Sequence, residues 1–376
     1  MTSDTDQPGK LRVVIAGGGV AALETMLALR ELAPDRTDVL VIAPAPEFVY
    51  RPMAVREPFA YGPAQHYALA PIVADAGATL LADRLAWVDR SARLAHTEGG
   101  ELISYDALVV ALGANPSPRY QHALTIDDRR LDEALHGLIQ DVDEGYVHSI
   151  AFVAPSLIAW PLPLYELALM TAARAKEMGV ALAVTILTPE RAPLAIFGAA
   201  ASGAVSRLLE QAQIETISSA ECEVPSPGKV VIDHGDRALQ VDRVVALPQL
   251  EGPAIRGIPL GDHGFIHVDP SGLVPDAGPI YAAGDATEFP VKHGGIAAEQ
   301  ADAAAHSIAA LAGAPVAPEP FDPVIRGMLL TGGRPVYISA RITGGEGFSS
   351  EISDAPTWSP PAKIAARYLA PYLDSH

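Results

Sequence analysis

The stretch from Leu11 to Leu32 constrains the fold of this chain more than any other. Its apolar run, Val13 to Ala16, is typical of a buried strand and leads directly into three glycines, Gly17 to Gly19. The residues that follow are rich in Ala and Leu at helical spacing. A strand, a glycine turn and a helix in this order predict the first unit of a dinucleotide-binding α/β domain.

The glycines fit the pattern G-x-G-x-x-A, in which each small residue has its own role. Gly17 permits the tight turn, Gly19 lets a pyrophosphate approach the backbone, and Ala22 allows the helix to pack closely on the strand. The helix would begin at Val20 and Ala21, where free N–H groups and a partial positive charge suit phosphate. The alternative is a glycine-rich turn that binds no ligand.

Composition narrows the classes of protein. The 376 residues suffice for two or three domains, and 49% of them are hydrophobic, which excludes disorder over most of the chain. The net charge of −19 argues against a nucleic-acid partner. Residues 1–10 are polar and acidic, unlike a signal peptide, and the longest uncharged run, Gly145 to Tyr165, contains three prolines. We therefore expect a cytoplasmic protein without a transmembrane helix, with peripheral membrane contact left open.

Cysteine and histidine usage limits the chemistry. Cys222 is the only cysteine and is expected in a loop, so an intrachain disulfide or a multi-cysteine metal site is excluded. His263 and His267 have the spacing H-x-x-x-H, but on the strand expected there they would lie roughly 13 Å apart, so no metal site is predicted.

The second strand, Asp38 to Ala43, departs from the usual dinucleotide pattern. An acidic residue normally ends this strand and accepts hydrogen bonds from ribose, but here Ala43 and Pro44 hold the position. Glu47 follows too late to be assigned this role, so ribose recognition stays unassigned. Further strands are expected over Thr79 to Asp89 and Leu102 to Leu112.

A later segment, Pro279 to Ala305, repeats the logic of the opening. A short strand ends at Gly284 and Asp285, and the pair Gly294-Gly295 begins an Ala-rich helix. Together with the opening fingerprint and the strand that ends at Gly113, this segment resembles the flavoproteins with two dinucleotide-binding domains. The chain is most similar to the type II NADH:quinone and sulfide:quinone oxidoreductases of the pyridine nucleotide-disulfide oxidoreductase superfamily, from Leu11 to about Gly313.

This resemblance implies an α/β fold with two Rossmann-like domains of the three-layer ββα type and a small C-terminal α+β segment. Residues 1–117 and 252–320 would form a discontinuous FAD-binding domain, and residues 118–251 an inserted domain like the NAD domain of the family. Residues 321–376 would cap the flavin or form an interface, for example in a homodimer. Within them we expect two strands joined by a Gly-Gly turn and a short helix.

The resemblance also implies non-covalent FAD and a set of contact residues. The residues that would contact FAD are Gly17, Gly19, Val20, Ala21, Ala22, Arg51, Ala111, Leu112, Gly113, Gly284, Asp285, Gly295, Ile296 and Ala297. Asp285 would accept hydrogen bonds from the ribityl chain or from pyrophosphate waters. The N–H groups of Gly295, Ile296 and Ala297 would face the flavin pyrimidine ring, where negative charge develops on reduction. The family usually has Thr where Leu112 stands, and Arg51 is alternatively a surface arginine.

The inserted domain lacks the second glycine fingerprint, with which the family binds NAD(P)H. The strand from Ser149 to Ala154 leads into Pro155 to Glu166, where prolines remove N–H donors and Trp160 adds bulk. We therefore doubt that NAD(P)H binds here. The absence of cysteines from this region also excludes thiol–disulfide exchange and sulfide oxidation through a cysteine trisulfide.

Three side chains are candidates for the flavin face. Glu166 begins a helix at a place where the family has a Glu, but the alternative is a first-turn carboxylate favoured by the helix dipole. Trp358 and Lys363 lie in the tail, where a helix that packs against another domain or a second subunit explains the pattern equally well.

The sequence therefore predicts an FAD-dependent oxidoreductase that passes an electron pair to a quinone-like or other small acceptor, with the donor left open. The alternative is a flavoprotein electron carrier that serves a protein redox partner without NAD(P)H, and the net charge of −19 would favour a basic partner. A dehydrogenase that binds NAD through the opening fingerprint alone is disfavoured, because Ile42 is followed by no carboxylate and the Gly284-Asp285 pair is present.

Overall fold

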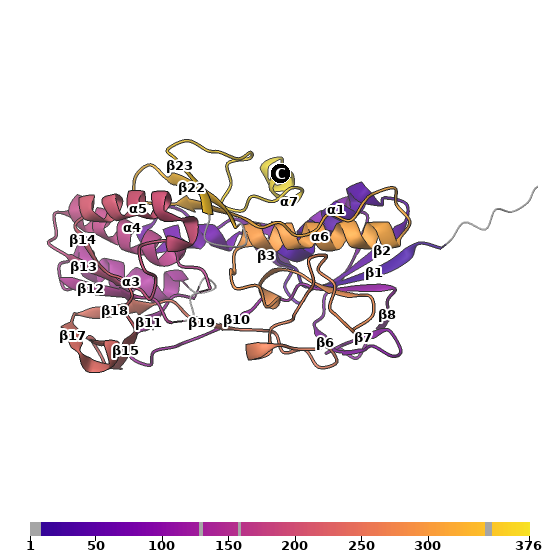
Figure 1. Cartoon of the computed structure of the whole chain (residues 1–376), viewed down its shortest axis with the longest axis horizontal. Coiled ribbons are helices and arrows are strands. Elements are labelled where there is room, and N and C mark those ends of the chain that lie inside the picture. The colour runs from indigo at the N-terminus through magenta and orange to yellow at the C-terminus, as the bar shows by residue number, and fades with distance from the viewer. Residues whose placement is uncertain (1–8, 128–130, 157–158, 343–347) are drawn as a thin grey trace, which may run out of the picture.

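The computed structural model describes residues 9–127, 131–156, 159–342 and 348–376. Two parallel β-sheets with their helices lie toward opposite ends of the long axis, and the C-terminal strands and helix lie above the region between them (Figure 1). This arrangement confirms the expected α/β class with two Rossmann-like units and a small C-terminal α+β segment. The exact domain boundaries stay predictions.

The N-terminal sheet has five parallel strands in the order β20-β9-β1-β2-β5. Its strands and covering helices are β1 (Leu11–Ala16), β2 (Thr37–Ile42), β5 (Thr79–Leu81), β9 (Ala107–Val110), β20 (Ile280–Ala282), α1 (Val20–Leu32) and α6 (Gly294–Leu311). Val13 and Ile15 pack with the two helices, whereas Val14 and Ala16 pack with an antiparallel sheet on the other face. That third layer is β6 (Leu85–Asp89), β7 (Leu94–Thr97) and β8 (Leu102–Ser104). Burial on both faces explains the continuous apolar run of β1.

The second parallel sheet repeats this design in the order β11-β18-β12-β13-β14. Its strands and helices are β11 (Leu124–Thr125), β12 (Ser149–Val153), β13 (Ala183–Leu187), β14 (Ile214–Ile217), β18 (Arg243–Ala246), α3 (Leu131–Asp143), α4 (Leu162–Met178) and α5 (Ala199–Gln211). Ile150 and Phe152 pack with the helices, and Ala151 and Val153 pack with a second antiparallel sheet. That sheet is β15 (Cys222–Ser226), β16 (Lys229–Ile232) and β17 (Arg237–Gln240).

Shorter elements complete the described chain. They are β3 (Glu47–Val49), β4 (His66–Ala68), α2 (Leu69–Asp75), β10 (Asn115–Ser117), β19 (Gln249–Glu251) and the 3₁₀ turns η1 (Arg51–Phe59), η2 (Ala195–Phe197), η3 (Asp233–Gly235), η4 (Asp262–Gly264) and η5 (Gly284–Ala286). The antiparallel pair β10-β19 connects the two sheets (Figure 1). No helix in these ranges combines the length and the apolar character needed to cross a bilayer.

The C-terminal segment returns to the N-terminal unit. It contains β21 (Val324–Leu329), β22 (Val336–Ile342), β23 (Phe348–Ser353) and α7 (Leu369–Asp374). The expected pair of strands is present, and the Gly-Gly turn lies outside the described residues. Fully buried Glu24 of α1 accepts hydrogen bonds from the N–H groups of Tyr368 (2.9 Å) and Leu369 (2.6 Å). Burial and the neighbouring Glu24 carboxylate raise the pKa of Asp302, so the pair favours retaining a proton between its two carboxyl groups.

Two of the expected strands are each two strands in different sheets. The stretch Thr79 to Asp89 forms β5 in the parallel sheet and β6 in the antiparallel one, and Leu102 to Leu112 forms β8 and β9 in the same way. In each stretch, apolar residues of both halves pack against the same layer of core, on either side of the charged residues Asp83-Arg84 in the first and Asp106 in the second. The break between them depends on which neighbours pair with each half, and periodicity does not contain that information.

Two smaller expectations were wrong. Cys222 begins β15 and is buried, rather than lying in a loop, because alternate residues of that strand face the core under the second sheet. The stretch around His263 and His267 is no strand, because it folds as the turn η4 followed by a single bridge at Ile266. The expected short tail helix is α7, and Ile364 lies before it in irregular chain.

Candidate functional site

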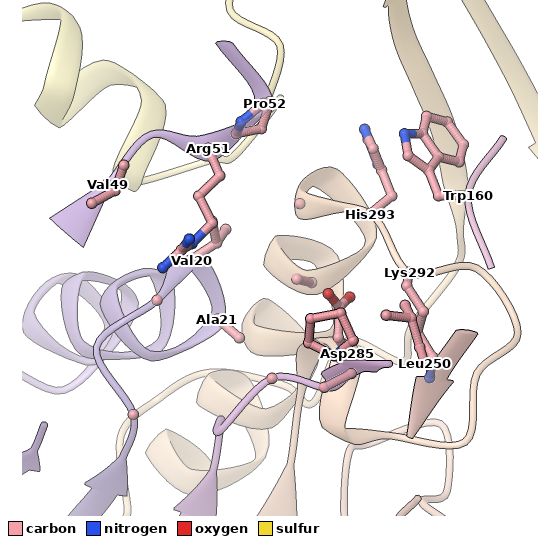
Figure 2. A pocket seen from close by; sticks show the side chains of 18 of the residues that line it. Val20, Ala21, Val49, Arg51, Pro52, Trp160, Leu250, Asp285, Lys292 and His293 are labelled. Carbon is pink, nitrogen blue, oxygen red and sulfur yellow. The ribbon is translucent and has the colours of Figure 1, made fainter. Parts of the chain in front are cut away.

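A cavity of about 650 Å³ lies at the carboxyl ends of β1, β2, β9 and β20 and reaches the inserted unit. Open parallel α/β sheets bind ligands at the carboxyl ends of their strands. The binding point lies between two neighbouring strands whose following connections leave toward opposite faces of the sheet. In the N-terminal sheet that point lies between β1 and β9. Figure 2 shows Arg51 and Asp285 on either side of the start of α1, with His293 and Trp160 side by side farther along the cavity.

The glycine turn after β1 forms the floor of the cavity. Gly17 has φ +133°, and a Cβ added to it would lie 2.1 Å from the carbonyl oxygen of Ala111, so only glycine fits between β1 and β9. At Gly19 an added Cβ would meet no atom within 4 Å, because that position faces open space. Gly19 is also the N-cap of α1 and offers no side-chain cap, so the first amides of the helix stay available to a ligand.

The loop that carries Asp285 is held in place by hydrogen bonds with the side chain of Gln300 in α6. The N–H of Gly284 donates to Gln300 Oε1 at 2.8 Å, and the Thr287 hydroxyl lies 3.1 Å from Gln300 Nε2. All three of these residues are buried, whereas Asp285 between them is half-buried and lines the cavity. The sequence drew attention to Asp285, but Gln300 gave no signal because it lies six residues past the helix start in an ordinary helical pattern.

Replacing Gln300 with Leu should leave the buried N–H of Gly284 without an acceptor. We expect the free energy of unfolding to fall by about 1–3 kcal/mol and FAD affinity to fall about tenfold, because the loop no longer holds Asp285 toward the cavity. Urea unfolding and equilibrium dialysis against FAD measure the two effects. Gln211→Leu, at the exposed end of α5, is the matched control. Unchanged FAD affinity in Gln300→Leu would show that the loop orients itself.

The N-terminus of α6 differs from the expectation. The N–H of Gly295 donates to Nδ1 of His293 at 3.2 Å, and the N–H of Ala297 donates to the carbonyl oxygen of His293 at 2.9 Å. Neither Gly295 nor Ile296 lines the cavity, although Gly294 and Ala297 do. The amides expected to face a flavin ring are thus partly used within the chain, because His293 caps the helix with its own side chain.

Glu166 and Lys363 meet at the far end of the cavity. The Nζ of Lys363 lies 2.6 and 2.8 Å from the two carboxylate oxygens of Glu166 and donates to the carbonyl oxygen of Pro52 at 2.9 Å. The N–H of Leu330 donates to the same carboxylate at 2.9 Å. Both charged side chains are almost completely buried, and both line the cavity.

The environment of this ion pair shifts both groups. Burial raises the pKa of Glu166, and the charge of Lys363 opposes that shift. Burial lowers the pKa of Lys363, and Glu166 opposes it in turn. Glu166 lies in the second turn of α4 and not in the first, so the alternative of a dipole-favoured first-turn carboxylate was wrong. Its position is explained by the ion pair.

Trp358 does not line the cavity. Its indole N–H donates to the carbonyl oxygen of Ala362 at 2.8 Å, and its ring packs edge-on against Tyr337. It therefore supports the segment that delivers Lys363, one residue after Ala362. Ala22 is also absent from the cavity wall, since it is fully buried in the core between α1 and the sheet.

The remaining predicted contact residues converge. Those that line the cavity are Gly17, Gly19, Val20, Ala21, Arg51, Ala111, Leu112, Gly113, Gly284, Asp285 and Ala297. Glu47 and Arg84 also line it, near the carboxyl end of β2. Glu47 had been set aside as too distant in sequence, but the short strand β3 brings it back to the cavity, where it lies 2.9 Å from Nδ1 of His66.

The cavity residues that were not predicted as cofactor contacts include Trp160, Lys292 and His293. The ring of Trp160 lies 4.4 Å from that of His293. Lys292 donates to the carbonyl oxygen of Thr287 and lies over the ring of Phe265, and burial lowers its pKa to about 8. A signal was present, because Lys292 and His293 directly precede Gly294-Gly295, where an N-cap is expected.

No family model matches the chain. Its sequence is 25% identical over 267 residues to sulfide-quinone reductase of Aquifex aeolicus (strain VF5), which covers 65% of this chain and 59% of that protein. The match thus spans less than two thirds of the relative.

Solved structures show the same fold. The sulfide:quinone oxidoreductase of Aquifex aeolicus superposes with a TM-score of 0.80 at 20% identity, over 92% of this chain and 87% of that one. A ferredoxin reductase from Rhodopseudomonas palustris gives 0.67 at 20% identity, over 92% and 89%. The covalent putidaredoxin reductase–putidaredoxin complex gives 0.62 at 18% identity, over 88% and 81%. By fold the chain is similar to these reductases, and by sequence it is similar to sulfide-quinone reductase, as its resemblance to the FAD-dependent pyridine nucleotide-disulfide oxidoreductase superfamily implies.

Proposed function

We propose that the chain binds FAD non-covalently in this cavity and is an oxidoreductase that passes an electron pair to a small acceptor such as a quinone. One observation carries the proposal: a single cavity is lined at one place by the glycine turn, Gly17 and Gly19, and at another by the buried ion pair of Glu166 and Lys363. The volume of the cavity is in the range of natural cofactor sites. The name of the curated relative, a sulfide-quinone reductase, supports an acceptor of the quinone type.

The residues present fit FAD. Gly17 leaves no room for a side chain, and Gly19 leaves the uncapped first turn of α1 open, which suits a pyrophosphate. Asp285 provides a carboxylate at the cavity wall for hydroxyl groups of the cofactor. Glu47 and Arg84 lie where the adenosine ribose would be held. FAD, once bound, would supply the two-electron chemistry, while the protein positions it and sets its electrostatic environment.

At the reacting end, Lys363 holds protons at Nζ on a side chain that is almost completely buried. The carboxylate of Glu166 keeps this ammonium group charged and points it along the cavity wall, against the tendency of burial to lower its pKa. The positive charge of Lys363 Nζ would stabilise the negative charge that a bound flavin gains when it is reduced. Pro52, Leu330 and Ile364 complete the enclosure around the pair.

The inserted unit offers little to a nicotinamide dinucleotide. Glu190 follows β13, the position from which an acidic residue accepts hydrogen bonds from ribose. Its carboxylate is already bonded to the hydroxyl of Tyr165 (2.7 Å), the N–H of Ala195 (3.1 Å) and the hydroxyl of Thr188 (3.2 Å). Burial also raises the pKa of the Glu190 carboxyl group above its ordinary value. These contacts support the proposal that the electron donor is not NAD(P)H.

A second obstacle lies at the start of α4. Pro161 is its N-cap residue and Pro163 stands in its first turn, so two of the amides that would receive a phosphate are missing. Trp160 lies in the cavity just before them, against His293 and near Phe197.

A spectroscopic experiment tests both parts of the proposal. The purified protein should be yellow, and heat should release intact FAD. Under anaerobic conditions neither NADH nor NADPH should bleach the flavin within minutes, whereas dithionite should bleach it at once. A colourless protein that takes up no added FAD would refute the proposed cofactor, and rapid bleaching by either nucleotide would refute the proposed exclusion of NAD(P)H.

A protein redox partner is the second candidate. The net charge of −19 would steer a basic carrier toward the surface, and two of the similar structures are reductases named for ferredoxin or putidaredoxin. Electron transfer to a protein should slow steeply as salt is added, whereas reduction of a neutral quinone should not.

A further inference from the structure

His293 occupies an unusual position between a helix and the cavity. It is the N-cap residue of α6, it is about nine-tenths buried, and it lines the cavity. Helix α6 begins beside the loop of Asp285, and the opposite wall at His293 is the ring of Trp160. Figure 2 shows the imidazole projecting away from Lys292 and alongside Trp160.

The hydrogen bond at Nδ1 decides the tautomer. A backbone N–H can only donate, so Nδ1, which lies 3.2 Å from the nitrogen of Gly295, carries no proton. The proton of the neutral ring is therefore on Nε2. The imidazole also stays neutral, because burial and the positive charges of Lys363 and Arg326 lower its pKa to about 3.

The Nε2–H needs an acceptor that the described chain does not provide. Nε2 has no hydrogen-bond partner among the described residues and keeps some access to open space, and the side chain to which it belongs lines the cavity. A few polar groups in the wall of a cofactor site usually fix the orientation of the ligand through hydrogen bonds. An unsatisfied, enclosed donor at the wall of a ligand cavity points to an acceptor atom on the ligand.

The topology indicates which part of the ligand this is. In such a sheet the adenosine lies at the end of the second strand, here β2 with Glu47 and Arg84, and the pyrophosphate lies at the start of α1. His293 lies at the other end, with Lys363 and Trp160. The redox-active ring would occupy that end.

We infer that His293 is a neutral hydrogen-bond donor, through Nε2–H, to a ring carbonyl of the bound flavin, and that it stabilises the reduced form. This inference rests on the proposed FAD site and adds a positioning device to it. The bond from Gly295 N–H at Nδ1 couples the positive end of the α6 dipole to the Nε2–H. The imidazole thereby takes over the role of the helix amides that it caps.

Two isosteric substitutions separate the cap from the donor. In His293→Asn the side-chain oxygen can accept from Gly295 N–H as Nδ1 does, but nothing reaches the place of Nε2. In His293→Gln the amide NH₂ reaches the place of Nε2, but the helix cap is lost. The measurements are the two-electron reduction potential of the bound flavin, against a reference dye, and the melting temperature.

His293→Asn should lower the potential while the melting temperature stays near that of the parent. A lost hydrogen bond to a charged form changes the oxidised-to-reduced equilibrium about tenfold to a hundredfold, which is about 30–60 mV for two electrons. His293→Gln should keep the potential and lower the melting temperature. The difference in potential between His293→Asn and the parent should be constant from pH 6 to pH 8, because His293 does not titrate there.

Other outcomes overturn the inference. If His293→Asn binds FAD with an unchanged potential, His293 only caps the helix. If its effect is confined to the KM for a quinone, the donor serves the acceptor and not the flavin. A potential difference that changes near pH 6.5 would show a charged imidazole. If the parent protein binds no FAD, the proposed function fails first, and this result is distinct from the others.

Discussion

Lys363→Met should be among the most destabilising single substitutions in this chain, lowering the free energy of unfolding by about 3–5 kcal/mol. The substitution leaves the carboxylate of Glu166 buried, with only the N–H of Leu330 still bonded to it. Its desolvation cost is then no longer offset by the ammonium group 2.6 Å away. Chemical denaturation of the FAD-loaded protein measures the loss.

The double variant Lys363→Met with Glu166→Gln isolates the pair. Removing both charges should recover much of the lost stability, because a buried ion pair replaced by neutral groups costs far less than a broken one. If the double variant is as unstable as the sum of the two single variants, the two side chains do not act as a pair. Flavin reduction in the double variant should nevertheless be impaired, since Lys363 Nζ no longer lies at the cavity wall.

The same variants give a test by pH. Without Lys363 the pKa of Glu166 rises further above its ordinary value, because burial then acts almost unopposed. The folded state therefore binds more protons than the unfolded one, so stability is greatest at low pH and is lost as pH rises from about 4.5 through the folded pKa. Lys363→Met should show this decline more steeply than the parent. The double variant should not show it at this site.

Gly17→Ala should prevent formation of the FAD site and destabilise the fold by about 3 kcal/mol or more. The added Cβ would lie 2.1 Å from the carbonyl oxygen of Ala111, so β1 and β9 would have to separate, and φ at Gly17 is +133°. We expect little folded, yellow protein. Thermal melting of the purified fraction and its FAD content measure the two effects.

Gly19→Ala distinguishes the fold from the ligand. Its Cβ meets no atom within 4 Å, so the variant should unfold within about 1 kcal/mol of the parent while binding FAD at least tenfold more weakly, because the methyl group stands between the helix amides and a phosphate. Gly137→Ala, an open position in α3, is the matched control and should bind FAD normally. Unchanged FAD affinity in Gly19→Ala would place the pyrophosphate elsewhere.

Local chemistry explains what could be predicted. The strand, the glycine turn and the helix between Leu11 and Leu32 form as expected, because the apolar run is buried on both faces and Gly17 has the one conformation that the turn requires. The family resemblance, which rested partly on the strand that ends at Gly284 and Asp285, predicted a cofactor contact at Asp285, and this residue lines the cavity just after β20. Both inferences use residues close together in the chain.

Pairing across the chain could not be predicted in this way. The stretch Thr79 to Asp89 was expected to be one strand, but its two halves hydrogen-bond within different sheets. Cys222 was expected in a loop because its neighbours are polar, but it is buried in a strand. Similarly, the expected amides at the start of α6 are partly occupied, because His293 turns back onto Gly295. In each case the structure depends on which hydrogen-bonding or packing partner a residue finds in the folded chain, and a local sequence pattern does not contain that information.

The sequence by itself therefore determined the strand–turn–helix unit and the glycine turn at the base of the cavity, because both follow from short-range sterics and from the two-sided burial of β1. The three-layer architecture was predicted only through the family resemblance. Only the tertiary structure decided that an ion pair lies at the far end of the cavity. Glu166 and Lys363 are 197 positions apart, and each alone is an ordinary charged residue on or near a helix. They are brought together because a buried charge requires a buried counter-charge, and the folded core determines which residue provides it.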